Sequence, residues 1–374
     1  MRIGLITTLK TNIGDDLIRE GICLLFQEAF KGHQIQFISV NKHIPMSVYP
    51  FWHPVHLEKI TRFLPMGRFR IGQFIKRFAI KLKRTRFDGC QLIVQCGAPV
   101  LWPNCHLCEW AEPLWYQVVG RLSESLPVLN LAAGSCYPWE RQPFRISDHG
   151  EAQFLKKILG YCQMTTVRDP LAQNLFTSLG EDTTLIPCSA FLAGRGKVNN
   201  RHHGKIVLIN YMSGAGHYDW NQGINPYHWR NTVTALIGQL RKRHPLAFLC
   251  HNESEYHMAQ ELAPEIPRLF PKTVGEYFDL VSNARVAICN RMHASVGLAG
   301  LGIPSIAVGT DTRLLMVNTI GLPSFYVKEM NLNQIEQGLE DLIRDLPKER
   351  ERLLTLQSET WNRYLEIISK FNFN

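Results

Sequence analysis

The sequence predicts an α/β protein made of two doubly wound, Rossmann-like lobes that face a cleft. The chain has 374 residues, which is more than one ordinary α/β core accommodates. Short apolar strands alternate with helices along the chain, and this alternation is typical of βαβ units in parallel sheets. The polar, basic stretch 193–204 interrupts it, so we expect an N-terminal lobe over 1–195 and a C-terminal lobe over 205–374 that includes the last helices.

The expected elements of the N-terminal lobe follow from apolar runs and from helical spacing of apolar residues. A helix with clear boundaries begins at Asp169 and Pro170, an N-cap residue followed by proline, and closes at Gly180. The other expected elements are strands at 3–6, 34–40, 91–95, 127–132 and 164–167, and helices at 15–30, 109–122 and 149–159.

The C-terminal lobe repeats the same alternation of strands and helices. We expect strands at 206–210, 246–250, 285–289 and 305–308, and helices at 228–243, 254–262, 274–283, 294–301, 331–345 and 347–370. Ligands of such sheets bind at the carboxyl ends of the strands. Polar clusters follow five expected strands, at Asn12–Asp16, Arg168, the loop after Asn210, His251–Glu255 and Asn290–His293.

Arg291 and His293 form the most informative of these clusters. They lie between the strand at 285–289 and the helix at 294–301, where the first backbone N–H groups of the helix have no partner. A helix N-terminus that carries a guanidinium and an imidazole is suited to a phosphate or carboxylate. The alternative is a surface arginine beside a histidine that caps the helix.

The positive charge of the chain is concentrated in one segment. Residues 62–87 contain nine Lys or Arg and no acidic residue, and they supply the whole net charge of +9. Their apolar residues share one helical face, which is typical of a helix that binds an anionic membrane or a polyanionic substrate. A helix packed on the core with a solvated basic face fits the pattern equally well. Nucleic acid is not expected as a partner, because no binding motif accompanies the charge.

The ten cysteines do not predict a metal site or disulfides. They are scattered without a regular spacing, as in reduced proteins of the cytosol. Cys105, His106 and Cys108 form a lone CxxC, and a zinc site needs a second pair of ligands. The N-terminal stretch lacks the features of a signal peptide, and no apolar run is long enough to span a bilayer. We therefore expect a cytoplasmic location, with peripheral attachment to the inner face of the membrane as a second option.

Three segments resemble the polysaccharide pyruvyl transferase family, in the order in which the family has them. They are NIGDD at 12–16, TTVRDPLAQNLFTSLG at 165–180, and the block at 274–308 that contains RMH, with Met292 where the family has leucine. The third block is the most specific. The resemblance covers about residues 1–325 and implies the architecture of the B-type glycosyltransferases.

The resemblance implies that pyruvate is transferred from phosphoenolpyruvate to sugar hydroxyls as a cyclic ketal, with release of phosphate. The sugar belongs to a cell-surface polysaccharide or its lipid-linked precursor. The acceptor is expected on the N-terminal lobe and the donor on the C-terminal lobe. No cofactor or metal is expected beside phosphoenolpyruvate.

Each expected site residue has a chemical role in that reaction. Arg291 and Arg168 bind the two anionic groups of the donor, because a guanidinium binds carboxylate or phosphate through two N–H groups. His293 is a phosphate ligand or the acid that assists phosphate departure. Asp15 orients or deprotonates the acceptor hydroxyl, unless it is an ordinary carboxylate at a helix N-terminus. Three further residues are expected to bind substrate, Asn12, Asn290 and His251, although a structural role fits His251 as well.

Two departures from the family pattern keep other functions open. Residues 96–99 read CGAP where the family has a glycine-rich turn, and Cys188 and Ser189 replace an Asp-Pro pair. One alternative is a two-lobe glycosyltransferase that uses a nucleotide sugar, with Asp311 as the nearby carboxylate for the ribose. The other alternative is a protein that binds the anion without turnover.

Overall fold

The computed structural model describes residues 1–57, 83–97, 99–197, 204–218 and 220–371. Within these residues the N-terminal lobe holds a seven-stranded sheet in the order β2-β1-β3-β5-β6-β7, with β4 paired to β5. Every strand pair in it is parallel. The strands are β1 (Arg2–Thr7), β2 (Gln36–Asn41), β3 (Leu92–Cys96), β4 (Pro99–Leu101), β5 (Val128–Ser135), β6 (Met164–Val167) and β7 (Thr184–Leu185).

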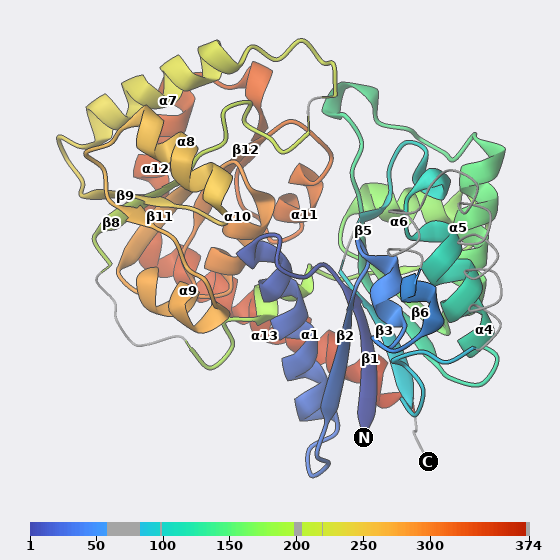
Figure 1. Ribbon diagram of the computed structural model, residues 1–374. Coiled ribbons are helices and arrows are strands. Elements are labelled where there is room, and N and C mark those ends of the chain that lie inside the picture. Colours follow the sequence, from blue (N-terminus) through green and yellow to red (C-terminus); the bar gives the residue numbers. More distant parts are fainter. Residues whose placement is uncertain (58–82, 98, 198–203, 219, 372–374) are drawn as a thin grey trace.

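The C-terminal lobe holds a second parallel sheet, with six strands in the order β10-β9-β8-β11-β12-β13. The strands are β8 (Ile206–Asn210), β9 (Leu246–Leu249), β10 (Arg268–Leu269), β11 (Ala284–Cys289), β12 (Ser305–Gly309) and β13 (Ser324–Tyr326). The two lobes lie side by side (Figure 1). The predicted fold class, two Rossmann-like lobes with parallel sheets, is confirmed.

Helices cover both sheets, and polar caps start many of them. Side chains of Asp148, Asp169, Asn252 and Thr273 each accept a hydrogen bond from a backbone N–H in the first turn of the following helix. The helices are α1 (Ile13–Ala29), α4 (Gly120–Leu122), α5 (His149–Tyr161), α6 (Pro170–Thr177), α7 (Pro226–Leu240), α8 (Glu253–Leu262), α9 (Val274–Leu280), α10 (Met292–Ala299), α11 (Leu314–Asn318), α12 (Leu332–Arg344) and α13 (Leu346–Ser369).

Short 3-10 turns connect these elements. They are η1 (Pro45–Val48), η2 (Pro54–Leu57), η4 (Cys105–Leu107), η6 (Trp139–Arg141), η7 (Ser189–Leu192) and η8 (Val327–Glu329). The tryptophan-rich helix expected at 109–122 is found, but most of it, η5 (Ala111–Val119), is π-helical. Helix α10 begins at Met292 and ends at Ala299, two residues earlier at each end than expected.

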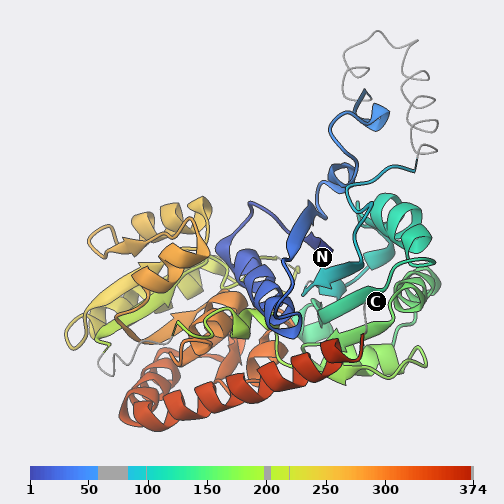
Figure 2. The same cartoon turned by 90° about the horizontal axis from the view of Figure 1, so that it is seen from below.

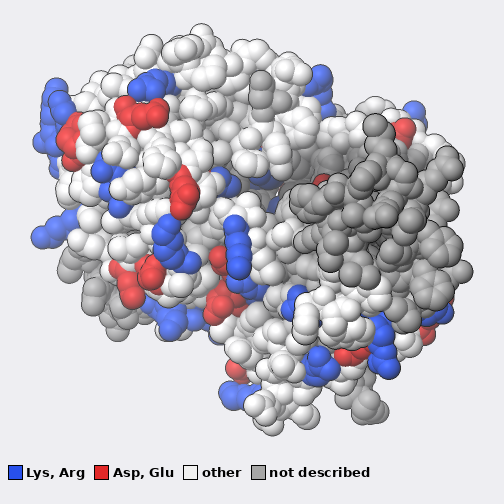
Figure 3. Space-filling model, in the orientation of Figure 1, with Lys and Arg blue, Asp and Glu red and all other residues white. Residues whose placement is uncertain are grey.

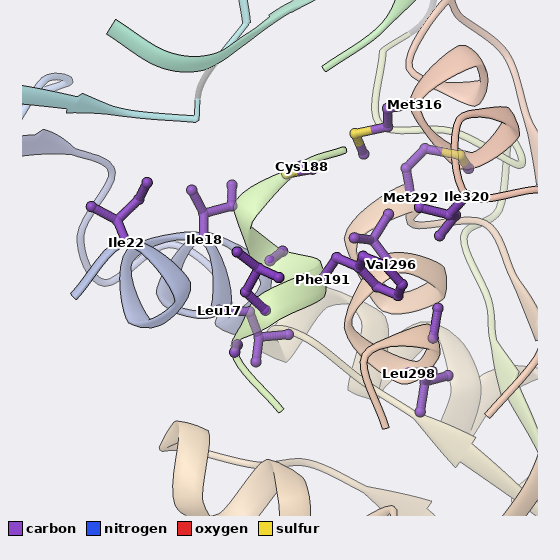
Figure 4. Packing of buried hydrophobic residues seen from close by; sticks show 14 of the residues in the cluster. Leu17, Ile18, Ile22, Cys188, Phe191, Met292, Val296, Leu298, Met316 and Ile320 are labelled. Atoms are coloured by element: carbon purple, nitrogen blue, oxygen red, sulfur yellow. The ribbon is translucent and has the colours of Figure 1, made fainter. Parts of the chain in front are cut away.

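A continuous hydrophobic core joins the lobes. Helix α1 packs against η7, and η7 packs against α10, so that η7 lies between the two helices (Figure 4). Gly21 and Gly300 allow this close approach, because a Cβ would lie 1.9 Å from Ser189 O at the first and 2.4 Å from Phe191 O at the second. Side chains from both lobes therefore belong to one core.

The last helix, α13, also contacts both lobes, along which it runs in Figure 2. Gln357 Nε2 donates hydrogen bonds to Phe191 O in η7 (2.8 Å) and to Gly300 O at the end of α10 (2.6 Å). Near the end of α13, Tyr364 Oη donates to Pro187 O at 3.0 Å. The C-terminal helix, assigned from the sequence to the second lobe, is thus also bonded to the first.

Most of the basic segment 62–87, and with it the predicted amphipathic helix, lies outside the described residues. At its described end, Phe87 is buried against Gly4 of β1. On the face shown in Figure 3, basic and acidic side chains are interspersed over the described surface. Among the described residues, none of the helices is long and apolar enough to cross a membrane.

Candidate active site

A cavity of about 540 Å³ lies where the carboxyl ends of strands from both sheets meet. This is the place at which doubly wound sheets bind ligands. Loops of both lobes form its walls, which combine charged and aromatic residues. The lining includes Asn12, Asp15, Lys42, Trp102, Trp110, His217, Tyr218, Trp220, Arg291, His293 and Arg313.

The turn from β11 into α10 places Arg291 and His293 in the wall of this cavity. The side chain of the residue between them, Met292, packs in the shared core near Met316 (Figure 4). Methionine fills the position of the family's leucine because the requirement there is an apolar side chain of similar volume. Met292 thus fixes the turn from behind, so that its two neighbours face the cavity.

Arg291 is held by a buried carboxylate. Its Nε donates to Glu255 Oε1 at 2.6 Å, and its Nη2 contacts the same oxygen. Glu255, only 1% exposed, also accepts from Asn210 Nδ2 and from the backbone N–H of His251, both at 2.8 Å. Two of the three guanidinium nitrogens of Arg291 are therefore occupied by Glu255. The sequence pattern predicts instead that two N–H groups of this side chain bind a ligand. The remaining nitrogen, Nη1, has no hydrogen bond to a described residue.

Asn290 has a positioning role in this arrangement. Its Oδ1 accepts from Met212 N (3.0 Å) and from Trp229 Nε1 (3.2 Å), and its Nδ2 donates to Val308 O (2.9 Å). The amide therefore ties the ends of β8, β11 and β12 together. Asn290 borders a small side pocket next to the cavity, but its hydrogen bonds go to the protein.

His293 is oriented by Arg168, which lies behind it. Arg168 Nη1 lies 3.2 Å from His293 Nε2. A guanidinium only donates hydrogen bonds, so Nε2 must accept, and the proton of the neutral imidazole is on Nδ1. Burial, together with the charges of Arg168, Arg313 and Arg291, holds the pKa of His293 well below its usual range. His293 is therefore a neutral hydrogen-bond donor at neutral pH.

Arg168 is fully buried and does not reach the cavity wall. Its Nη1 donates to Gly97 O at 2.8 Å and lies 3.6 Å from Cys188 Sγ, whereas Nε and Nη2 have no partner among the described residues. Both departures from the family pattern thus lie against this one side chain. Arg168 forms no ion pair with a described residue, and it contacts the cavity through His293.

The sequence did not single out Arg313, which follows β12 and lines the cavity. Its Nε and Nη2 donate to the two carboxylate oxygens of Asp311, at 2.8 and 2.6 Å. His217, in the loop after β8, also lines the cavity, and desolvation together with the charges of Arg291 and Arg313 lowers its pKa to about 4. Arg291 and Arg313 are each fixed by a buried acid, and both face the space beside His293.

Asp15 and Lys42 face the cavity from the N-terminal lobe. Asp15 Oδ2 accepts from Asn12 Nδ2 at 2.5 Å. Burial raises the pKa of Asp15, and the charges of Lys42 and Arg291 oppose that rise. Lys42 directly follows β2 and is buried, with Nζ 4.7 Å from the centre of the Trp110 ring.

An aromatic wall completes the cavity, formed by Trp102, Trp110, Tyr218 and Trp220. The Trp102 and Trp110 rings pack edge to face at 5.2 Å, and Tyr218 lies 5.3 Å from Trp220. The Arg313 guanidinium lies over the Tyr218 ring at 5.1 Å, so charged and aromatic residues adjoin. Such surfaces bind ligands that have both an apolar face and polar groups.

His251 does not reach the cavity wall. It is almost fully buried next to Tyr277, and neither ring nitrogen has a partner among the described residues. Its backbone carbonyl accepts from Ile13 N at 3.2 Å, which connects the start of α1 to the other lobe. The structural role that the sequence left open for His251 agrees with this placement.

The CxxC cysteines have high thiol pKa values. Burial raises the pKa of Cys105, and it raises that of Cys108 to about 11, so both are thiols at neutral pH. His106 lies near Asp148 and Glu151 rather than forming a cluster with these cysteines in the described part of the chain.

The sequence did not predict three features of the cavity. They are the two arginine–carboxylate pairs (Glu255–Arg291 and Asp311–Arg313), the position of Lys42, and the aromatic wall. Asp311 was considered only for a ribose, and Glu255 was one of five polar residues in its cluster. A lysine directly after an apolar strand was a usable signal for Lys42. No local pattern shows which loops bring their tryptophans together.

The fold defines a two-lobe protein with the architecture of the B-type glycosyltransferases and a cavity between the lobes. The family model of the polysaccharide pyruvyl transferases matches residues 12–312, and the chain belongs to this family. It is accordingly a transferase of polysaccharide pyruvylation, with a pyruvate donor and a glycan acceptor.

Solved structures of low sequence identity share the fold. The UDP-GlcNAc 2-epimerase of Neisseria meningitidis is 12% identical with a TM-score of 0.55, over 99% of this chain and 100% of that chain. A putative UDP-N-acetylglucosamine 2-epimerase of Listeria monocytogenes is 10% identical with a TM-score of 0.53, over 98% and 95%. S. aureus MnaA with UDP is 14% identical with a TM-score of 0.52, over 97% and 92%. No curated protein matches the sequence.

Proposed function

We propose that the protein transfers the pyruvate unit of phosphoenolpyruvate to two hydroxyls of one sugar, forming a cyclic ketal and releasing phosphate. The observation that carries this proposal is the cavity, in which cationic groups and an aromatic wall adjoin. The cationic groups suit a small, highly charged donor, and the aromatic wall suits a pyranose ring.

Arg291, Arg313 and His293 would bind the donor. Each guanidinium is fixed by its own acid, so the donor does not have to order a mobile side chain when it binds. His293 would donate its Nδ1–H to a phosphate or carboxylate oxygen. Because Arg168 occupies Nε2, His293 serves better as a donor of hydrogen bonds than as the acid that assists phosphate departure.

The acceptor would lie against the tryptophans, with its hydroxyls toward Asp15. A pyranose ring stacks its C–H face on an aromatic ring while its hydroxyls remain free for polar partners. The carboxylates of the described cavity wall are Asp15 and Glu109. Asp15 is the one that would accept the hydroxyl proton, since Glu109 is exposed and its Oε1 lies 2.9 Å from His43 Nδ1.

The alternative of a nucleotide-sugar glycosyltransferase is disfavoured by Asp311. Both of its carboxylate oxygens are hydrogen-bonded to Arg313, so it is not free to bind a ribose. A non-catalytic binding protein would bind the donor without releasing phosphate, so a phosphate-release assay distinguishes it from a transferase.

Thermal-shift measurements test the donor. A ligand that binds only the folded state raises the melting temperature. We expect stabilisation by phosphoenolpyruvate and none by UDP- or ADP-sugars; the reverse result would overturn the proposal. Release of phosphate only when a sugar acceptor is added distinguishes transfer from binding.

Arg291→Lys tests the donor site directly. A lysine can still pair with Glu255, so the fold is expected to survive, but the nitrogen that faces the cavity is lost. We expect at least a tenfold loss of phosphoenolpyruvate-dependent phosphate release, while Arg285→Lys, in the preceding strand β11, keeps the wild-type rate. Unchanged turnover of Arg291→Lys would refute the assignment.

We further propose that a lipid-linked acceptor is met at an anionic membrane surface through segment 62–87. Close before this segment, Phe51 is 92% and Trp52 is 58% exposed, and such side chains bind the interface of a bilayer. Neutralising Lys76, Arg77, Lys83 and Arg84 should abolish sedimentation with phosphatidylglycerol vesicles. Unchanged sedimentation would remove the membrane from the proposal.

A further inference from the structure

Lys42 has surroundings that are unusual for a lysine. It is only 5% exposed, and its ammonium group lies over the Trp110 ring rather than in water. Nζ forms no ion pair or hydrogen bond with a described residue, and it lines the same cavity as Asp15, Arg291 and His293. A buried cation that faces a substrate cavity without a partner has a free N–H to give to a ligand.

The charged groups around Lys42 come from three parts of the chain. Asp15 of α1 and, before η5, Cys108 and Glu109 favour the ammonium form, whereas Arg168 after β6 opposes it. Burial is the largest effect, and it lowers the pKa of Lys42 to about 8. A lysine with such a pKa is protonated at neutral pH and still releases its proton readily.

The proposed reaction requires a proton at the methylene carbon of the enolpyruvyl group, and the residues discussed so far do not supply it. His293 accepts a hydrogen bond at Nε2 and is neutral, and Asp15 is assigned to the acceptor hydroxyl. The arginines do not release protons near neutral pH. Two other histidines line the described cavity wall: His217 is neutral at neutral pH, and His43 Nδ1 lies 2.9 Å from Glu109 Oε1. Lys42 is the buried cation of this wall whose N–H groups have no partner among the described residues.

We propose that Lys42 is a catalytic acid that gives its proton to the methylene carbon of the donor, an inference that rests on the proposed function. The electron pair of the C=C bond forms the new C–H bond, and the first hydroxyl oxygen bonds to the central carbon. The proton of that hydroxyl passes to Asp15 and then to the neutral amine of Lys42, which returns to its ammonium form. The bond from the central carbon to the phosphate oxygen then breaks, the second hydroxyl oxygen takes its place, and the second hydroxyl proton leaves with the phosphate.

Chemical protection tests whether Lys42 lies in the donor site. Reductive methylation with formaldehyde and a borane is followed by mass spectrometry, with and without phosphoenolpyruvate. We expect the donor to slow methylation of Lys42 at least fivefold and to leave Lys157 unaffected. Lys157, which lies 4.4 Å from the Tyr116 ring on the surface, is a matched lysine outside the cavity. Equal methylation of Lys42 with and without the donor would overturn the proposal.

Kinetics of Lys42 variants test its chemical role. The assay measures phosphate release with p-nitrophenyl β-galactoside, β-glucoside and N-acetyl-β-glucosaminide and with UDP-N-acetylglucosamine as acceptors. A positioned acid contributes about 100-fold or more to the rate. Lys42→Arg, which keeps the charge but holds its proton, should therefore lower kcat about 100-fold with KM for the donor within about fivefold. Lys157→Arg should behave like the wild type.

Rescue by small amines separates proton donation from charge. Lys42→Ala leaves space for methylammonium, which has an acidic N–H, whereas tetramethylammonium has the charge alone. We expect methylammonium to restore kcat of Lys42→Ala at least tenfold and tetramethylammonium to restore none of it. In a separate pH profile, kcat of the wild type should fall above about pH 8, and this fall should be absent in Lys42→Arg. Equal rescue by both ions, or normal kcat in Lys42→Arg, would overturn the role of Lys42 and leave the proposed function intact. A wild-type protein that neither binds nor consumes phosphoenolpyruvate would overturn both.

Discussion

At the scale of single residues, the two arginines of the cavity wall are held by acids that do not line the cavity. Glu255 is buried, and it orients the Arg291 guanidinium by accepting its hydrogen bond. It also accepts hydrogen bonds from the Asn210 side chain and the backbone N–H of His251. Asp311 orients the Arg313 guanidinium in the same way. The proposed donor site would therefore be formed before a ligand enters, because the two arginines are fixed by the protein.

Replacing Glu255 should cost both stability and binding. In Glu255→Gln the buried guanidinium loses its counter-charge, and breaking a buried pair in this way costs about 3–5 kcal/mol. Chemical denaturation measures this cost, and KM for phosphoenolpyruvate should rise as Arg291 loses its fixed position. Glu336→Gln, at the more exposed pair with Arg243, is the control and should change stability by less than about 1 kcal/mol. Equal effects of the two substitutions would contradict the role of Glu255.

Three histidines with lowered pKa values should make the fold sensitive to acid. The pKa values of His217, His251 and His293 are below that of a free histidine, so the unfolded chain binds more protons when the pH falls below about 6.5. The free energy of unfolding should therefore fall from pH 6.5 toward pH 4. His251→Asn should reduce this slope, as measured by urea denaturation at several pH values, whereas His228→Asn, on an exposed turn of α7, should keep it. The same slope in His251→Asn and the wild type would show that His251 does not titrate as described.

At the scale of elements, the site is set by how closely α1 approaches α10. Gly14, in the first turn of α1, faces the His293 side chain directly. The NIGDD segment of the first lobe and the RMH segment of the second, far apart in the sequence, thus contact each other. The glycine is required for this contact because a side chain there has no space.

Gly14→Ala should disturb the site more than the fold. The added Cβ would lie 2.8 Å from His293 Cβ and 2.8 Å from Asn12 Oδ1, so His293 and Asn12 must shift from their positions at the cavity. We expect at least a tenfold loss of turnover. Gly238→Ala, in α7 with no atom near the new Cβ, is the matched control; it should keep full activity and gain about 0.5–1 kcal/mol of stability. Wild-type turnover in Gly14→Ala would show that this contact does not matter.

At the scale of the whole molecule, two helices join the lobes into one folding unit. α1 contributes to the shared core, and α13 donates hydrogen bonds to η7 and to the end of α10. We therefore expect a single unfolding transition in calorimetry.

Gln357→Leu tests this connection. It leaves the carbonyls of Phe191 and Gly300 without their buried donor, which costs about 1–3 kcal/mol each. The melting temperature should fall while one transition remains. Gln337→Leu, on the exposed surface of α12, should have little effect. Two separate transitions in the wild type would contradict the single unit.

The sequence predicted the features that depend on local pattern. The strand and helix alternation, the Asp169 cap with Pro170, and the turn that carries Arg291 and His293 follow from neighbours in the chain. The Glu255–Arg291 pair joins residues 36 positions apart, and the Arg168–His293 contact joins residues 125 positions apart. Such contacts depend on strand order, which a single sequence does not show. The sequence therefore predicted that Arg168 binds a ligand directly, whereas the structure places it outside the cavity wall, in contact with His293.

The continuous core between the lobes limits how the protein can move. Proteins with two lobes often close around a ligand by rotation about a hinge. Here a rotation would have to separate α1 from η7 and η7 from α10, exposing apolar side chains such as Leu17, Phe191 and Val296 to water (Figure 4). We expect the lobes to keep one separation throughout turnover. Substrates would then enter and leave through the mouth of the cavity, and its width would limit the size of the glycan that can be modified.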